Sequence, residues 1–107
     1  MFDLDVTYSV SDFLKLCRNS IVQNIPPCWI QGEISNLSRP SSGHWYFSLK
    51  DPSGQVKCAF FRFNQRKIKF SPENGMSVVI RGAATIYEQR GDFQLVVQEM
   101  DPAGIGN

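Results

Sequence analysis

Four consecutive ring-bearing side chains, residues 44–47 (HWYF), give the first indication of chemistry in this chain of 107 residues. Neighbouring side chains of a β-strand point to opposite faces, so the four rings cannot all enter one core. Alternation places Trp45 and Phe47 on one face and His44 and Tyr46 on the other. The first pair suits a hydrophobic core, whereas an outward ring beside cations can stack on a nucleic-acid base.

Cations and further aromatic residues recur on the outward faces and at the loop ends of the neighbouring predicted strands. Aromatic rings can stack on bases and Lys or Arg can pair with phosphates, a combination typical of sequence-tolerant single-strand binders. The candidate nucleic-acid-binding residues are Arg39, Ser42, His44, Tyr46, Lys50, Lys57, Phe61, Arg62, Arg81, Tyr87 and Arg90. Among them we expect Tyr46 and Phe61 to stack on bases and the basic residues to contact phosphates.

Each of these assignments has a structural alternative. Tyrosine is common on half-buried strands, so Tyr46 and Tyr87 could serve packing alone. Phe61 could pack under the helix that is expected before the strands. Loop arginines such as Arg39 and Arg90 are ordinarily only solvated. The sequence leaves both interpretations open for these side chains.

No catalytic or metal-binding constellation is visible. His44 is the only histidine and has no Ser or Cys nucleophile beside it in an obvious motif. Cys17, Cys28 and Cys58 lack a CxxC spacing, which argues against a zinc site and for reduced, buried thiols. There is no carboxylate pair, P-loop or dinucleotide-binding glycine motif. We therefore predict no catalytic residue, no metal and no cofactor within this chain.

Charge is unevenly distributed along the chain. The formal net charge is only +1, but residues 39–90 carry nine basic side chains against three acidic ones. This layout is compatible with a polyanion that contacts one side of the molecule. Glu33 lies on the first predicted strand, where we expect it to pair with a neighbouring Arg or to accept a hydrogen bond from a base. No secretion signal or membrane span is evident, so a cytoplasmic location is predicted.

A helix is predicted over about residues 9–22. Ser9 has the properties of an N-cap with Asp12 as its capping-box partner, and Pro26-Pro27 ends the helix. Apolar residues at positions 10, 13, 14, 17 and 21 form one stripe on one helical face. We expect this stripe to dock on the same domain and to cap one end of the fold; binding of a partner is the alternative.

Everything after residue 27 is predicted as strands, apart from one short helix. Alternating apolar positions indicate strands over 29–36, 44–50, 55–62, 77–87 and 93–100, with a short basic helix over 64–70. Trp29 and Trp45 are assigned to the core, although Trp29 follows Pro27 and could lie at a rim. Gly32 and Gly82 lie mid-strand, where glycine permits the sharp coiling of a small barrel.

This order of elements predicts a mainly β fold. Five strongly bent strands at this length most economically form a five-stranded OB-fold barrel, over about residues 28–101. An N-terminal capping helix precedes the barrel, and the short helix falls between strands 3 and 4. Residues 1–107 are expected to form this single domain. An SH3-like barrel or a small sandwich is the alternative architecture.

Several sequence blocks resemble one bacterial family. The blocks are 29–36 (WIQGEISN), 40–51 (PSSGHWYFSLKD), 58–62 (CAFFR), 75–76 (GM), 87–95 (YEQRGDFQL) and 100–104 (MDPAG). From Tyr8 onward, the chain resembles the amino-terminal domain of the large subunit of bacterial exodeoxyribonuclease VII. Gln89, where that family usually has proline, and Phe93, where it usually has tyrosine, are slight departures.

The resemblance implies an OB-fold that binds single-stranded DNA and presents it to a nuclease domain. In that family the large subunit continues into a catalytic domain and long helices that gather small subunits. The enzyme degrades single-stranded DNA from both ends into short oligonucleotides. We therefore expect the parent's catalytic domain to be absent from residues 1–107 and this portion to be non-catalytic. The implied partners are single-stranded DNA, the nuclease domain and the small subunits, with no membrane.

An assembly module is the alternative function. The same barrel face would then contact another subunit or the nuclease domain, with Phe61 and Tyr87 as interface anchors. Self-association of the isolated domain is compatible with either function, because it covers exposed apolar surface. Salt-dependent oligonucleotide binding favours the first hypothesis, and a dimer that binds no DNA favours the second.

Overall fold

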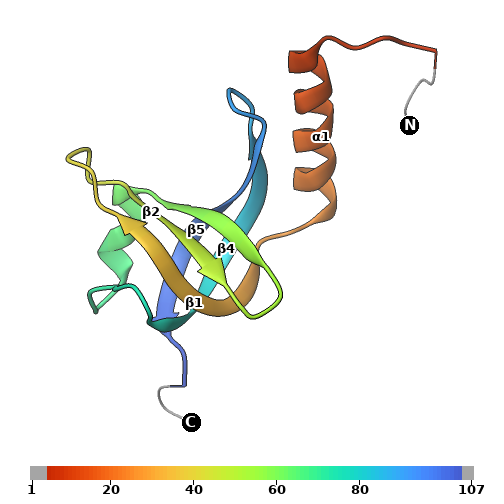
Figure 1. The fold of residues 1–107 in the computed structure, drawn as a ribbon. Coiled ribbons are helices and arrows are strands. Elements are labelled where there is room, and N and C mark those ends of the chain that lie inside the picture. Colours follow the sequence, from red (N-terminus) through yellow and green to blue (C-terminus); the bar gives the residue numbers. More distant parts are fainter. Residues whose placement is uncertain (1–4, 105–107) are drawn as a thin grey trace.

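The computed structural model describes residues 5–104, which form one helix, five strands and one short 3-10 helix (Figure 1). The elements are α1 (Val10–Asn24), β1 (Cys28–Ser38), β2 (Trp45–Lys50), β3 (Gln55–Phe60), η1 (Arg62–Lys67), β4 (Ser77–Tyr87) and β5 (Asp92–Pro102). The basic segment thus forms a 3-10 helix that begins two residues earlier than the expected short helix. No helix among these residues is long and apolar enough to cross a membrane.

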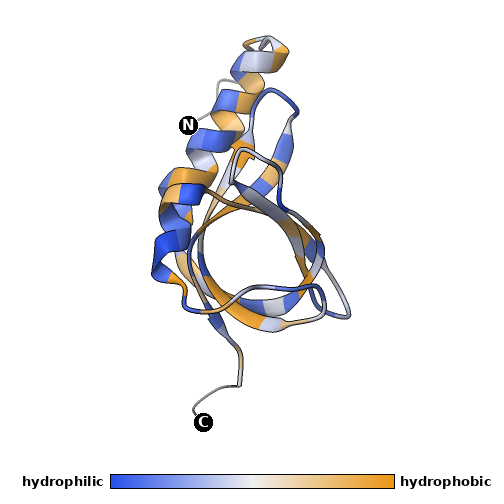
Figure 2. Ribbon diagram, turned by 90° about the vertical axis from the view of Figure 1, so that its left-hand side faces the viewer, coloured by the Kyte–Doolittle hydropathy of each residue, from blue (hydrophilic) through white to orange (hydrophobic). Residues whose placement is uncertain are grey.

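The strands close into a barrel in the order β1-β2-β3-β5-β4, and Figure 2 looks through their ring. Only β3 and β5 pair in parallel; the other four pairings are antiparallel. β1 pairs with β4 up to Glu33 and with β2 from Glu33 onward, so one bent strand joins both halves of the ring. Because η1 lies between β3 and β4 in the sequence, this is the topology of an OB-fold. The predicted fold class is confirmed.

Gly32 lies where β1 passes from β4 to β2. A Cβ atom on Gly32 would lie 2.8 Å from the Leu49 Cγ and 2.9 Å from the Lys50 carbonyl oxygen. The approach of β2 is therefore possible only without a side chain. Gly82 differs, since the nearest atom to a Cβ there lies at 3.6 Å, an ordinary contact. Only the first of the two mid-strand glycines is required by close packing.

The core fills the inside of the barrel. Its fully buried large side chains are Phe60, Ile34, Ile80, Met100, Val78 and Val97, together with Pro72. Phe47 is also buried, and Trp45 packs edge-on against Phe60 with ring centroids 5.9 Å apart. Trp29 does not belong to this core, because it is 49% exposed. That prediction was wrong because Ile30, next to Trp29 on β1, takes the inward position.

α1 begins as predicted: the Ser9 Oγ accepts a hydrogen bond of 3.1 Å from the backbone N–H of Asp12. The helix stands beside the barrel, along β4 and the β4–β5 hairpin (Figures 1 and 2). Ile21 contacts the core, and the Arg18 guanidinium lies 3.0 Å from the Glu88 carboxylate.

The apolar stripe of α1 docks only in part. No residue of the helix is fully buried, and at its N-terminal end Val10 is 78% and Phe13 is 53% exposed. The expectation that the whole stripe packs on its own domain is corrected accordingly. The physical reason is that α1 rises past the end of the hairpin, so that its first turns extend beyond the barrel (Figure 1).

Candidate nucleic-acid interface

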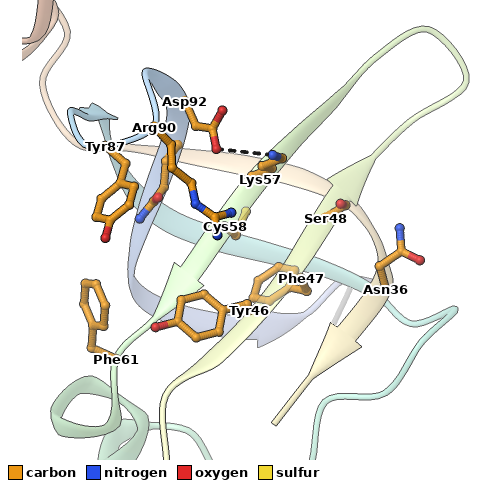
Figure 3. Close-up of a pocket in the computed structure, with 11 residues that line it drawn as sticks. Asn36, Tyr46, Phe47, Ser48, Lys57, Cys58, Phe61, Tyr87, Arg90 and Asp92 are labelled. Atoms are coloured by element: carbon orange, nitrogen blue, oxygen red, sulfur yellow. Dashed lines mark hydrogen bonds and ion pairs between the residues drawn. The ribbon is translucent and has the colours of Figure 1, made fainter. Parts of the chain in front are cut away.

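One hollow of about 570 Å³ opens on the outer face of β2 and β3, beside the β4–β5 hairpin (Figure 3). It brings together five of the eleven predicted site residues: Tyr46, Lys57, Phe61, Tyr87 and Arg90. Its lining also includes Asn36, Phe47, Ser48, Cys58, Asp92 and Gln94. We call this hollow the hairpin pocket.

Besides the buried Phe47, three rings line the hairpin pocket. Tyr46 is 41% exposed, so it points away from the core, as the alternation in the sequence predicted. Tyr87 is also exposed, and its hydroxyl donates a 2.7 Å hydrogen bond to the Gln89 side-chain oxygen. In Figure 3 the ring of Tyr46 is directed toward Phe61, while Tyr87 borders the same hollow from the hairpin. These rings offer flat apolar faces of the kind on which bases stack.

Two cations reach the hairpin pocket. The Arg90 side chain extends from the hairpin toward the middle of the pocket (Figure 3), and no ion pair within residues 5–104 involves it. The Lys57 ammonium lies 3.4 Å from the Asp92 carboxylate, which partly neutralises it. With one acid against two bases, the lining keeps a small positive charge.

The other predicted cations lie elsewhere. Lys50 is at the far end of β2, where its ammonium lies 3.8 Å from the Glu33 carboxylate. The partner of Glu33 is therefore a lysine and not the expected arginine. The Arg39 guanidinium lies 4.8 Å from the centre of the Trp45 ring and donates to the Pro72 carbonyl.

Arg81 also lies outside the hairpin pocket. It stands opposite Trp29 on β1 and Glu99 on β5, because β4 lies between those two strands and is not a neighbour of β2 or β3. The expectation that the cations of strands 2 to 4 share one face is therefore corrected. Ala59, which lies between the larger Tyr46 and Val96 in the ladder, is fully buried.

Ser42, His44 and Arg62 line a second hollow next to the first, together with two residues that the sequence analysis did not single out, Phe63 and Arg66. His44 connects the two hollows. Its ring meets Phe61 edge to face, with centroids 5.3 Å apart. Its Nδ1 accepts a 3.1 Å hydrogen bond from the backbone N–H of Arg62. His44 thus has a structural contact on one side and a pocket-lining ring on the other.

Cys58 lies on the buried side of the hairpin pocket. Burial raises the pKa of its thiol to about 12, although a backbone hydrogen bond from Leu49 acts in the opposite direction. The thiol is therefore protonated and a poor nucleophile at neutral pH. Within residues 5–104, no cluster of His, Cys, Asp or Glu is arranged to hold a metal ion. What the pocket offers is stacking, hydrogen bonding and positive charge.

Residues 8–101 match a protein family described as an OB-fold nucleic acid binding domain. The chain belongs to this family. The chain is 62% identical over 107 residues to the exodeoxyribonuclease 7 large subunit of Vesicomyosocius okutanii, and 59% identical to that of Ruthia magnifica. The same subunit of Haemophilus influenzae is 46% identical over 102 residues. The resemblance predicted from the sequence blocks is thus confirmed.

The OB domain covers only part of these relatives. All of the chain matches the Vesicomyosocius and Ruthia proteins, and 95% of it matches the Haemophilus protein, but it spans 23% of the length of each.

Solved structures share the fold at low identity. A replication protein A heterotrimer bound to ssDNA matches 70% of the chain, over 55% of its own chain, with a TM-score of 0.54 and 17% identity. An asparaginyl-tRNA synthetase from Pyrococcus horikoshii matches 79% of the chain, over 22% of its own, with a TM-score of 0.55 and 14% identity. These likenesses concern the fold alone.

Proposed function

We propose that this OB domain binds single-stranded DNA across the hairpin pocket. The observation that carries the proposal is the exposed Tyr46 ring on β2, which shares one hollow with Phe61, Tyr87 and the extended Arg90 side chain. Rings and cations in one hollow are what a flexible single strand needs, because it exposes bases and phosphates together. A membership in the nucleic-acid-binding OB family supports the same conclusion.

We further propose that the domain serves a larger exodeoxyribonuclease of the kind named for its relatives. The OB domain would hold single-stranded DNA and present it to a nuclease domain, within a complex that includes small subunits. Hydrolysis would take place in the nuclease domain, and residues 1–107 would contribute binding only. The three cysteines are free, although Cys58 alone is buried as predicted, while Cys17 is half-buried and Cys28 is exposed. Free thiols suit the reducing cytoplasm, so a cytoplasmic location is part of the proposal.

Binding of a labelled oligo-dT at several salt concentrations tests the proposal. Each phosphate contact on a single strand contributes about −0.7 to the slope of log K against log salt. With Lys57 and Arg90 as the phosphate contacts of the pocket, we expect a slope of at least about −1.4 for the chain. Arg90→Gln should make this slope shallower by about 0.7. Absence of binding, or tight binding that ignores salt, would contradict the proposal.

The ion pair between Lys57 and Asp92 gives a second prediction. Asp92→Asn should raise DNA affinity, because it frees the lysine and removes a carboxylate that repels phosphate. Exposed ion pairs contribute about 0.2–1 kcal/mol, so the expected gain at low salt is up to about fivefold. Glu33→Gln is the matched control, since Glu33 pairs with Lys50 outside the hairpin pocket. An equal gain in both variants, measured by fluorescence anisotropy, would mean that only net charge matters.

Assembly with another protein is the second candidate function. The structure favours a different contact surface from the predicted one, in which Phe61 and Tyr87 were the interface anchors. Phe61 and Tyr87 face the hairpin pocket, whereas α1 leaves Val10 and Phe13 near its start and Val22 near its end exposed. Exposed apolar surface of this kind is typical of protein contacts. Light scattering during the oligonucleotide titration distinguishes the two: a dimer that binds no DNA would support assembly and contradict DNA binding.

A further inference from the structure

The 3-10 helix η1 carries a second aromatic and cationic surface. Phe63 is 71% exposed, and the Arg66 guanidinium carbon lies 4.3 Å from the centre of its ring. Residues 62–69 contain four basic side chains, and no acidic residue occurs between Asp51 and Glu73. None of the ion pairs among residues 5–104 involves these four cations. This is the strongest local excess of positive charge in the sequence, and none of the described ion pairs neutralises it.

The η1 surface borders the hairpin pocket. Ser42, His44, Arg62, Phe63 and Arg66 line a hollow of about 570 Å³. The boundary between this hollow and the hairpin pocket is the edge-to-face pair of His44 and Phe61, because His44 lines one and Phe61 lines the other. A single DNA strand that leaves the hairpin pocket over these two rings therefore reaches η1 directly.

The η1 surface is held in place by hydrogen bonds from one side chain. The Gln65 amide nitrogen donates to the Gly43 carbonyl and to the Phe60 carbonyl, both at 2.8 Å. These bonds tie η1 to the β1–β2 loop and to the end of β3. The Arg62 side chain packs closely on Gly43, where a Cβ atom would lie 2.6 Å from the Arg62 Cδ. Phe63 and Arg66 thus project from a fixed base rather than from a loose loop.

We infer that η1 is a second subsite for the same single DNA strand. This inference rests on the proposed function. Phe63 stacks on a base with the ring face that Arg66 leaves free, and Arg62 and Arg66 contact the adjacent phosphates. Cations next to an exposed ring, continuous with the hairpin pocket, favour a nucleic acid over an acidic peptide, because a peptide needs the charge but not the flat ring. The strand therefore runs from the β4–β5 hairpin over His44 and Phe61 to η1.

Oligonucleotide length tests this inference. OB-folds bind about 4–16 nucleotides, so the probes are labelled oligo-dT chains of about 4 and about 12 nucleotides, read by fluorescence anisotropy. The longer probe should bind more tightly. Phe63→Ala should weaken the longer probe by about 5-fold to 150-fold and leave the shorter probe unchanged. Arg66→Gln should make the salt slope of the longer probe shallower by about 0.7.

Lys15→Gln is the control for charge, because it removes one exposed cation on α1, which Figure 1 shows across the barrel from η1. It should leave the salt slope of the longer probe unchanged. If Phe63→Ala leaves the longer probe unaffected while Tyr46→Ala weakens it, the second subsite is overturned, the proposed function stands, and η1 is left to a protein partner. Equal losses for both probes would also overturn a separate subsite. If neither probe binds the unaltered chain, the proposed function itself fails.

Discussion

Replacement of Gly32 by alanine is expected to lower the free energy of unfolding by about 1–3 kcal/mol, the usual cost of adding a group to a filled site. The added Cβ would meet the Leu49 Cγ at 2.8 Å and the Lys50 carbonyl oxygen at 2.9 Å. Neither atom can move aside without a large cost in free energy, since Leu49 is buried in the core and the oxygen belongs to the backbone of β2. Relief therefore requires β1 and β2 to separate at the point where β1 passes from β4 to β2.

Urea unfolding, followed by tryptophan fluorescence, measures this effect, and two other glycines provide controls. Gly54→Ala has no atom within 4 Å of the new Cβ, and Gly82→Ala meets only ordinary contacts from 3.6 Å. Neither should destabilise the domain, because alanine also reduces the conformational freedom of the unfolded chain. A Gly32→Ala variant as stable as these two would show that β1 and β2 do not approach closely there.

The fold was largely predictable from the sequence because its determinants are local. The alternation of Trp45, Tyr46 and Phe47 assigns the two faces of β2 without knowledge of any partner strand. Trp29 shows the limit of that reasoning. Both it and its neighbour Ile30 are apolar, so hydropathy alone does not say which of them faces the core.

The candidate site was predictable only in part, because strand order decides which outward side chains meet. Lys57 and Asp92 are 35 residues apart, yet they pair because β3 lies beside β5 in the barrel. Arg81 was placed with Tyr46 on alternation alone, but β4 lies between β1 and β5. No local pattern carries this information. Phe63 followed a predicted strand and preceded a predicted helix, and only the structure shows its exposure beside Arg66.

Tyr46→Ala is expected to weaken binding of oligo-dT by about 1–3 kcal/mol, the usual contribution of one stacked base. The ring is exposed on β2, so its removal leaves the core intact. Tyr46→Phe should keep most of the affinity, because stacking depends on the ring rather than on its hydroxyl. Fluorescence anisotropy with a labelled oligonucleotide provides the affinities, and the urea midpoints of the variants confirm that each one is folded.

Trp29→Ala separates stacking in the hairpin pocket from a general effect of exposed rings. Trp29 is 49% exposed and Tyr46 is 41% exposed, but Trp29 lies on β1 opposite Arg81 and does not line the pocket. If the DNA strand crosses the barrel over β2 and β3, only Tyr46→Ala should lower the affinity for DNA, and Trp29→Ala should leave it unchanged. If both variants lose the same affinity, DNA contacts the barrel without a preferred face. If only Trp29→Ala weakens binding, the strand runs over β1 and β4 beside Arg81, and the hairpin pocket serves another purpose.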